Sequence, residues 1–399
     1  MWHVSSELHD ASLRSMRRLM HFLLLLPPCP HLHLKLLYTF GLLIYIVFIL
    51  YWRFSFNYNV VYNFRNDHFS RATDLFAFSL LAVSHWVVAM ELIWRNRSER
   101  IEQHLEKIRY VLRVQFGHKV NLVRIRRYCQ SLLLLFEVSC VSLLGMAIYN
   151  NLVTDLVVLL LYAVYSEMVL LMRFSEFSLH AVLILVFYME LNEVSFRLIM
   201  ELDKTQFEVK SVRRLSLERL LVLQQLHGQL WNTVRSIECN FELSLVTVLL
   251  KFFVDAHILP YWMYVNMHNN INFIIVFYCI TEELCKLLAI IVSCLICTRC
   301  GRLQRQLRSI YHGLTTDRSN EQLNFYLYRI SSQLGQERCQ FSAGGFLVIN
   351  NEILGKFIFG MISYIVVCIQ FRISLIDNSP AEAIENSVTD LQFTEGEFA

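Results

Sequence analysis

Residues Ile349 to Phe371 read Ile-Asn-Asn-Glu-Ile-Leu-Gly-Lys-Phe-Ile-Phe-Gly-Met-Ile-Ser-Tyr-Ile-Val-Val-Cys-Ile-Gln-Phe. As a helix rising about 1.5 Å per residue, this stretch would be roughly 34 Å long, enough to cross a hydrocarbon core of about 30 Å. Residues at helical spacing would share one largely polar face, made of Glu352, Lys356, Phe359, Ser363, Val367 and Gln370. Because lipid cannot satisfy polar groups, we expect this face to line the interior of a helix bundle or a water-filled pore.

The composition of the chain is that of a membrane protein. Apolar residues make up 55% of its 399 residues and charged residues only 17%, whereas soluble domains average about 25% charged residues. The apolar residues also come in blocks too long for the core helices of a soluble protein. A net charge of +3 is too small to indicate a nucleic-acid partner.

Seven apolar segments are long enough to cross a membrane as helices. They comprise residues 32–52, 73–94, 131–149, 156–191, 241–264, 271–298 and 349–371. The fourth segment joins two apolar runs, because the basic loops on either side of residues 131–191 require an even number of crossings between them. The sequence therefore predicts an all-α polytopic membrane protein, with residues 32–371 as one seven-span domain.

The basic residues are concentrated on one side of the predicted membrane. Segments assigned to the cytoplasm hold 28 of the 36 lysines and arginines, counting Lys35 at the inner end of the first span, and the outer segments hold four. The positive-inside rule then places residues 1–31 in the cytoplasm and the acidic tail 372–399 outside. This orientation is the reverse of that of a G-protein-coupled receptor. The five apolar residues 22–26 are too few for a secretory signal, so we expect no cleavage.

The segments assigned to the cytoplasm carry apolar residues at helical spacing, which predicts further helices that pack on one another. One stripe comprises Ile101, Leu105, Ile108 and Leu112, and two more comprise Leu303, Leu307, Ile310 and Leu314, and Leu323, Leu327, Ile330 and Leu334. Within the fourth span, Arg173 and Glu176 are three residues apart and are expected to pair.

The end of the quoted stretch carries a short motif, Ser363-Tyr364, five apolar residues and then Gln370-Phe371. It resembles the motif that closes the last transmembrane helix of insect gustatory receptors, which is Thr-Tyr, five apolar residues, then Gln-Phe. Serine in place of threonine keeps the hydroxyl. The small residues between Phe341 and Phe346 also resemble the family's approach to that helix.

This resemblance implies a tetrameric, ligand-gated, non-selective cation channel in the cell membrane of sensory neurons. The last helices of four subunits would surround the pore, with pore and gate residues Ser363, Val367, Gln370 and Phe371. Cytoplasmic helices would join the subunits, and a small-molecule tastant or contact pheromone would bind an outward-opening pocket. The implied partners are this ligand, monovalent and divalent cations, other gustatory receptor subunits and membrane lipid.

Several aromatic and polar residues near the outer ends of the second to sixth spans are suited to stack on or hydrogen-bond a small molecule. They are His85, Trp86, Tyr149, Tyr162, Tyr165, Tyr261 and Trp262. Anchoring at the membrane interface is an equal or better interpretation of Tyr149, Tyr261 and Trp262. A hydrogen bond within the bundle is the simpler interpretation of His85.

No enzyme signature is present in the sequence, and we expect neither a cofactor nor a metal. Cys294, Cys297 and Cys300 have a spacing seen in metal sites, but no fourth cysteine lies beside them. Two alternatives to a channel remain open, a secondary transporter of small polar molecules and a metabotropic seven-helix receptor. Ionisable residues within or beside spans, among them Glu167, Asp255, Glu282 and Lys286, are compatible with a transporter. We find no inverted repeat to support it.

The predicted orientation can be tested directly. Asn96-Arg97-Ser98 is the only N-glycosylation sequon in the chain, and the predicted topology places it in the cytoplasm, away from glycosyltransferases. We expect no N-glycan, and we expect an epitope tag after Ala399 to be stained on unpermeabilised cells. A glycan at Asn96, or a tag stained only after permeabilisation, would contradict the inverted topology.

Overall fold

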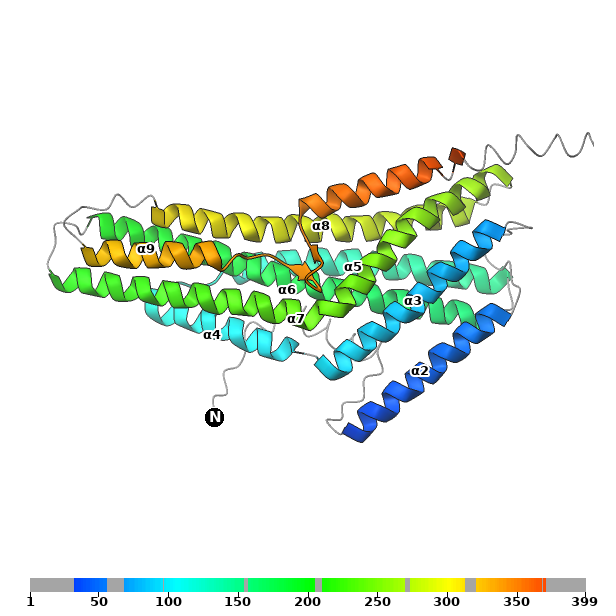
Figure 1. The fold of residues 1–399 in the computed structure, drawn as a ribbon, viewed down its shortest axis with the longest axis horizontal. Helices are drawn as coiled ribbons and strands as arrows, with labels where there is room; N and C mark the ends of the chain where they lie inside the picture. The colour runs from blue at the N-terminus through cyan, green and yellow to red at the C-terminus, as the bar shows by residue number, and fades with distance from the viewer. Residues whose placement is uncertain are drawn as a thin grey trace, which may run out of the picture.

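The structure, a computed structural model, describes residues 32–55, 68–95, 97–153, 157–204, 210–269, 273–312, 321–367 and 369–370. Nearly all of these residues are helical (Figure 1). The helices are α2 (Leu32–Ser55), α3 (His68–Arg95), α4 (Ser98–Phe116), α5 (Leu122–Val153), α6 (Val157–Lys204), α7 (Lys210–Asn269), α8 (Phe273–His312) and α9 (Glu321–Gln336). A final helix, here called the last helix, covers residues 351–367. The two-residue strands β1 (Ser342–Ala343) and β2 (Leu347–Val348) pair antiparallel just before it.

Six of these helices are long and apolar enough to cross a membrane, judged by length and composition within the described residues. They are α2, α3, α5, α6, α7 and α8, and the last helix occupies the seventh predicted span. The fourth predicted span, residues 156–191, lies on the single helix α6 from Val157 onward, while residue 156 is outside the described residues. The all-α fold class expected from the sequence is therefore confirmed, while the orientation in the membrane stays a prediction.

The three longest helices extend well beyond one membrane thickness. Helices α6, α7 and α8 contain 48, 60 and 40 residues, which correspond to roughly 72, 90 and 60 Å at a rise of 1.5 Å per residue. Figure 1 shows them running along the long axis of the molecule, with α4 and α9 toward one end and α2 and the last helix toward the other. Much of the basic sequence between the predicted spans thus continues the spans as helix.

The amphipathic helices bury the stripes that their sequences predict. All four apolar residues of the α4 stripe are buried, and α4 ends at Gly117, whose φ of 62° lies in the left-handed region. In α9, Leu327, Ile330 and Leu334 are buried, while Leu323 lies outside the residues whose side chains are described. In α8, Leu307 is buried in the same core and Leu303 and Ile310 are partly buried against it, while Leu314 lies outside the described residues.

Helix α6 occupies the centre of the bundle, and α2 lies at its edge. Every residue from Phe177 to Tyr188 of α6 is buried. By contrast, α2 exposes large apolar side chains along its length, including Leu37, Phe40, Ile44, Phe48 and Tyr51. An exposed apolar surface of this kind suits contact with lipid.

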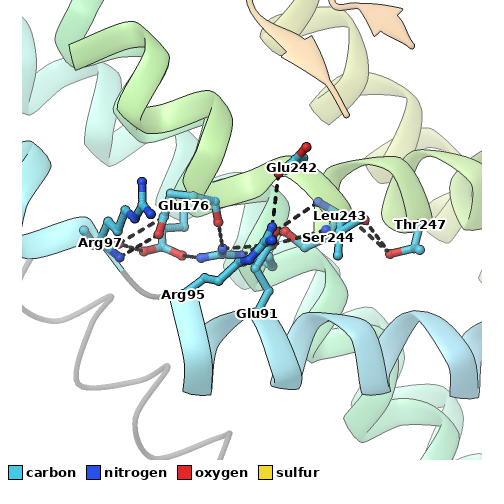
Figure 2. Close-up of polar contacts among 11 residues, drawn as sticks. Glu91, Arg95, Arg97, Glu176, Glu242, Leu243, Ser244 and Thr247 are labelled. Carbon is cyan, nitrogen blue, oxygen red and sulfur yellow. Dashed lines mark hydrogen bonds and ion pairs between the residues drawn. The ribbon is translucent and has the colours of Figure 1, made fainter. Parts of the chain in front are cut away.

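A buried ion network joins α3, α4, α6 and α7. The guanidinium of Arg173 lies 2.7 Å from Glu176 and 3.2 Å from Glu91, and it donates to Ser244 at 3.2 Å. The Arg173–Glu176 pair expected from the sequence is therefore confirmed. Glu91 also accepts the backbone N–H groups of Leu243 and Ser244, as Figure 2 shows. Every charge in this network thus has several partners.

The same network fixes the junction between α3 and α4. Glu176 accepts a hydrogen bond of 2.9 Å from Ser98, the first residue of α4. The backbone N–H of Arg97 donates to the side chain of Asn240 at 2.7 Å. At the exposed edge of this junction, Arg95 pairs with Glu242 at 3.1 Å (Figure 2). The direction in which the chain enters α4 is therefore set by contacts to α6 and α7.

Replacing Arg173 with methionine would leave Glu91 and Glu176 buried without their cation. We expect this change to lower the stability of the solubilised protein by about 3–5 kcal/mol, measured as a drop in apparent Tm. Arg95→Met breaks the exposed pair with Glu242 and serves as the control, with an expected cost of about 1 kcal/mol or less. Equal effects of the two changes would show that the buried network contributes no more than a surface pair.

Candidate functional site

An aromatic cluster forms where α3 and α6 meet. The ring of His85 on α3 lies 5.8 Å from that of Tyr162 and 5.2 Å from that of Tyr165, both on α6. Tyr162 also contacts Tyr45 of α2 at 5.7 Å and Phe78 of α3 at 5.9 Å. We call Tyr45, Phe78, His85, Tyr162 and Tyr165 the aromatic cluster. Its edge-on and tilted ring pairs are the arrangements that aromatic side chains prefer.

Two polar atoms at this cluster lack a hydrogen-bond partner among the described residues. They are the hydroxyl of Tyr162 and the indole N–H of Trp86, and both are buried. Ser166 lies beside the Tyr162 hydroxyl and interacts with it, and it also contacts His85 Nδ1 at 3.0 Å. A buried polar group without a partner costs about 1–3 kcal/mol. A bound molecule with an acceptor oxygen would remove that cost.

The predicted ligand-binding residues are brought together only in part. His85, Trp86, Tyr162 and Tyr165 lie in or beside the aromatic cluster, because Trp86 packs against the small core formed by Ile46, Ile49, Ala82 and Tyr162. Tyr261 is buried on α7. The side chains of Tyr149 on α5 and Trp262 on α7 lie outside those that the structure describes, so their role stays a prediction.

Three members of this site were not predicted from the sequence. Tyr45 and Phe78 come from the first two spans, and nothing in their own sequence context distinguishes them from other apolar residues facing a bundle. Ser166 carried a usable signal, because it follows Tyr162 by four residues and so lies on the same face of α6.

The last helix packs on α7 through one side only. The ring of Phe357 lies 5.3 Å from that of Phe253, and the ring of Tyr364 lies 4.9 Å from that of His257. Gly360 lies between these contacts, and a Cβ added there would come within 3.3 Å of the Phe253 ring. The tyrosine of the closing motif is thus a packing residue against α7.

A second face of the last helix, next to the packed side, is exposed. Glu352, Lys356, Phe359, Ser363, Val367 and Gln370 are all exposed, including two large apolar side chains, Phe359 at 74% and Val367 at 59%. Lys356 forms an ion pair with Glu352 at 2.7 Å. These are the six residues that the sequence places on one face, so that periodicity is confirmed. Phe371 lies outside the described residues.

A hairpin and a cap position the start of the last helix. Ser342 donates from its backbone N–H and its hydroxyl to Glu238 of α7, at 2.8 and 2.7 Å. The turn that follows uses Gly344 and Gly345, whose φ values of 58° and 72° favour glycine. Asn350 then caps the helix by accepting the backbone N–H groups of Glu352 and Ile353.

Two groups of side chains within the described residues have the geometry to hold a metal ion. In the first, Glu167, Asp255 and Glu282 converge, but the ammonium of Lys286 already lies 3.3, 2.6 and 2.5 Å from their oxygens. In the second, His118 lies 2.5 Å from Glu190, and Glu193 pairs with Arg197. Lys286 in the first group and Arg197 in the second therefore place a positive charge beside these carboxylates.

Comparison with known proteins places this architecture in a family. The family model described as 7tm Chemosensory receptor matches residues 13–375. The chain belongs to the 7tm chemosensory receptor family. A Drosophila melanogaster protein that carries the name gustatory receptor 98a is 43% identical over 374 residues, which cover 94% of each chain. The resemblance to insect gustatory receptors is thereby confirmed.

Solved structures of a more distant receptor share the fold. The olfactory receptor OR5 from the insect Machilis hrabei, solved in complex with eugenol, matches with a TM-score of 0.62 and 14% sequence identity. A second structure of the same receptor matches with a TM-score of 0.55 and 12% sequence identity. Each comparison covers 91% of this chain and 100% of the other.

The close packing of Gly360 against Phe253 can be tested by comparing the same substitution at Gly360 and at Gly355. Gly360→Leu would press against the Phe253 ring, and we expect it to destabilise the solubilised protein by about 1–3 kcal/mol. Gly355 lies on the same helix, and a Cβ there would meet nothing within 4 Å. We expect Gly355→Leu to stay within about 0.5 kcal/mol of the unchanged protein. Comparable losses in Tm for both variants would argue against tight packing of the last helix on α7.

Proposed function

We propose that the chain is a subunit of a tetrameric, ligand-gated, non-selective cation channel that detects small-molecule tastants or contact pheromones. The observation that carries this proposal is the exposed face of the last helix, which combines charged, polar and apolar residues along a membrane span. Lipid would leave its polar groups unsatisfied. Four such faces around a common axis would line a path for monovalent and divalent cations, in a homo- or heterotetramer.

Family membership supports this assignment. The relative from Drosophila melanogaster is named as a gustatory receptor, and the olfactory receptor of the same fold was solved with the small molecule eugenol. In our proposal the chain takes the predicted orientation in the cell membrane of sensory neurons, with its N-terminus in the cytoplasm and its acidic tail outside. The exposed apolar side chains of α2 would then face lipid.

The aromatic cluster is the proposed ligand site. Its rings offer stacking surface, and the buried Trp86 N–H has no hydrogen-bond partner within the described residues, while the Tyr162 hydroxyl has Ser166 beside it. A ligand that accepts a hydrogen bond from Tyr162 would gain about 1 kcal/mol, or roughly a fivefold increase in affinity. Tyr149, Tyr261 and Trp262 remain proposed members of the outer part of this site.

The deciding experiment is to record current from purified protein in planar bilayers, which contain no G protein. We expect cation current when members of a panel of sugars, bitter compounds and cuticular lipids are added. Tyr162→Phe should raise the half-maximal concentration of an oxygen-containing agonist about fivefold. Tyr328→Phe, an exposed residue on α9, should leave it unchanged. Saturable substrate uptake without channel current would favour a transporter, and signalling that requires a G protein would favour a metabotropic receptor.

The outer end of the last helix is the proposed gate. In a tetramer with the predicted orientation, Gln370 and Phe371 would form the outer constriction, with Ser363 and Val367 further in. A ring of four amides would stabilise the closed pore by about 1 kcal/mol for each net hydrogen bond. Gln370 is exposed at the end of the described helix, so its amide is available for contacts between subunits.

We expect Gln370→Ala to reach the cell surface normally and to show raised basal current or altered cation permeability ratios, measured by voltage clamp. Cysteine accessibility provides the control. Ser363→Cys on the exposed face should react with an aqueous thiol reagent in the open channel, while Phe357→Cys on the buried side should not. A Gln370→Ala variant with no leak and unchanged selectivity would remove this residue from the gate.

A further inference from the structure

A cluster of buried charges lies between α6, α7 and α8. Its members, here called the charge cluster, are Glu167 of α6, Lys251 and Asp255 of α7, and Glu282 and Lys286 of α8, and all are buried. Lys251 lies 2.9 Å from Glu167 and also pairs with Asp255. Lys286 contacts carboxylates from all three helices, at 2.5 Å for Glu282, 2.6 Å for Asp255 and 3.3 Å for Glu167.

Stability alone does not account for such a cluster. Desolvating buried ions offsets much of their attraction, and apolar side chains of similar volume commonly stabilise a protein at least as well. Ionisable residues within membrane spans therefore point to a functional role. Glu283 of α8 also interacts with the charges of this cluster, so carboxyl groups outnumber the two lysines.

The charge cluster shares α6 with the aromatic cluster and α7 with the surface that holds the last helix. Glu167 directly follows Ser166, whose hydroxyl contacts His85 at 3.0 Å. On the other side, Asp255 lies between Phe253 and His257, the two residues of α7 whose rings contact the last helix. A shift of α6 at the aromatic cluster therefore displaces Glu167 relative to the lysines, and a shift of α7 displaces the residues that hold the last helix.

Glu167 is the least tightly held acid of the cluster. Its contact to Lys286 is the longest of the three that this lysine makes, at 3.3 Å. The Oε2 atom involved is buried and makes no hydrogen bond among the described residues. Lys286 can therefore release Glu167 while it keeps its contacts to Asp255 and Glu282, and Glu167 then keeps its contact to Lys251. With and without the Glu167–Lys286 contact, the cluster would have the two discrete arrangements that transmission between distant sites requires.

We propose that Glu167 is a positioning residue that links the aromatic cluster to the last helix by making and releasing its contact with Lys286. The proposal rests on the proposed function for the roles of the two sites that it connects. The proposal predicts that a change in side-chain volume at the aromatic cluster alters the accessibility of the exposed face of the last helix. This effect should require the Glu167 carboxylate.

The experiment uses no ligand and no current. Ser363→Cys is introduced on the exposed face of the last helix, and its reaction with a membrane-impermeant methanethiosulfonate is followed by peptide mass spectrometry on the full chain, so that native cysteines are counted separately. Tyr162→Trp enlarges a side chain within the aromatic cluster, as an added ligand would. We expect it to change the reaction rate at position 363 at least fivefold, the low end of typical coupling between sites.

Adding Glu167→Gln should reduce this change to less than twofold, while Glu167→Asp, which keeps the carboxylate, should restore part of it. Arg197→Met, which breaks an exposed ion pair with Glu193 on the same helix, is the control and should leave the change intact. If Glu167→Gln does not fold, Glu167→Met, which replaces the carboxylate with an apolar side chain of similar volume, serves as the second variant with the same expectation. The proposal would be overturned if Tyr162→Trp left the reaction rate at position 363 unchanged. It would also be overturned if the rate still changed after the Glu167 carboxylate had been removed.

Failure of the proposed function has a different signature. A chain that passes no ligand-evoked current in bilayers, yet shows the rate change at position 363 and its loss in Glu167→Gln, would refute the channel and retain the coupling. A chain that conducts, but whose position 363 responds equally with and without the Glu167 carboxylate, would retain the channel and refute the coupling.

Discussion

The packing of α3, α4, α6 and α7 against one another depends on the ion pairs that the Arg173 guanidinium forms with Glu91 and Glu176. Arg173 is 1% exposed and holds Glu91 and Glu176 while stacking on the ring of Phe241 at 4.0 Å. Each carboxylate also accepts hydrogen bonds from other groups, so the whole network is satisfied and specifies one arrangement of the four helices. A partly satisfied version would cost more than an apolar core. Because α3 carries His85, this junction also sets where the aromatic cluster forms.

Much of the fold follows from local patterns in the sequence. The apolar stripe of α4, the polar face of the last helix and the Arg173–Glu176 pair all depend on residues a few positions apart on one helix, and all are found as expected. The network partner of Arg173 on α3, Glu91, was not predicted, because it is 82 residues away in the chain and no helical periodicity links the two. Tyr45 was not predicted as a member of the aromatic cluster for the same reason, because it lies on a different helix and far in sequence from Tyr162.

The contacts within the charge cluster also could be predicted only in part from the sequence. The sequence indicates which ionisable residues lie in spans, and Lys251 with Asp255 or Glu282 with Lys286 fall four residues apart on their helices. It does not indicate that both lysines reach Glu167, since that depends on the packing of three helices. The long continuous helices were also only partly predicted. Proline disfavours a helix interior, yet Pro260 lies inside α7.

The attachment of the last helix has a consequence for biosynthesis. Its hairpin is held by Glu238, its first turn contacts Thr298 of α8, and its buried side rests on Phe253 and His257. All of these partners precede it in the chain, so the ribosome has already delivered them when the last helix emerges. The bundle of α3, α6, α7 and α8 thus forms a template onto which the final segment docks. A nonsense mutation immediately before Ser342 would keep the helices of that template and delete the last helix together with the rest of the chain.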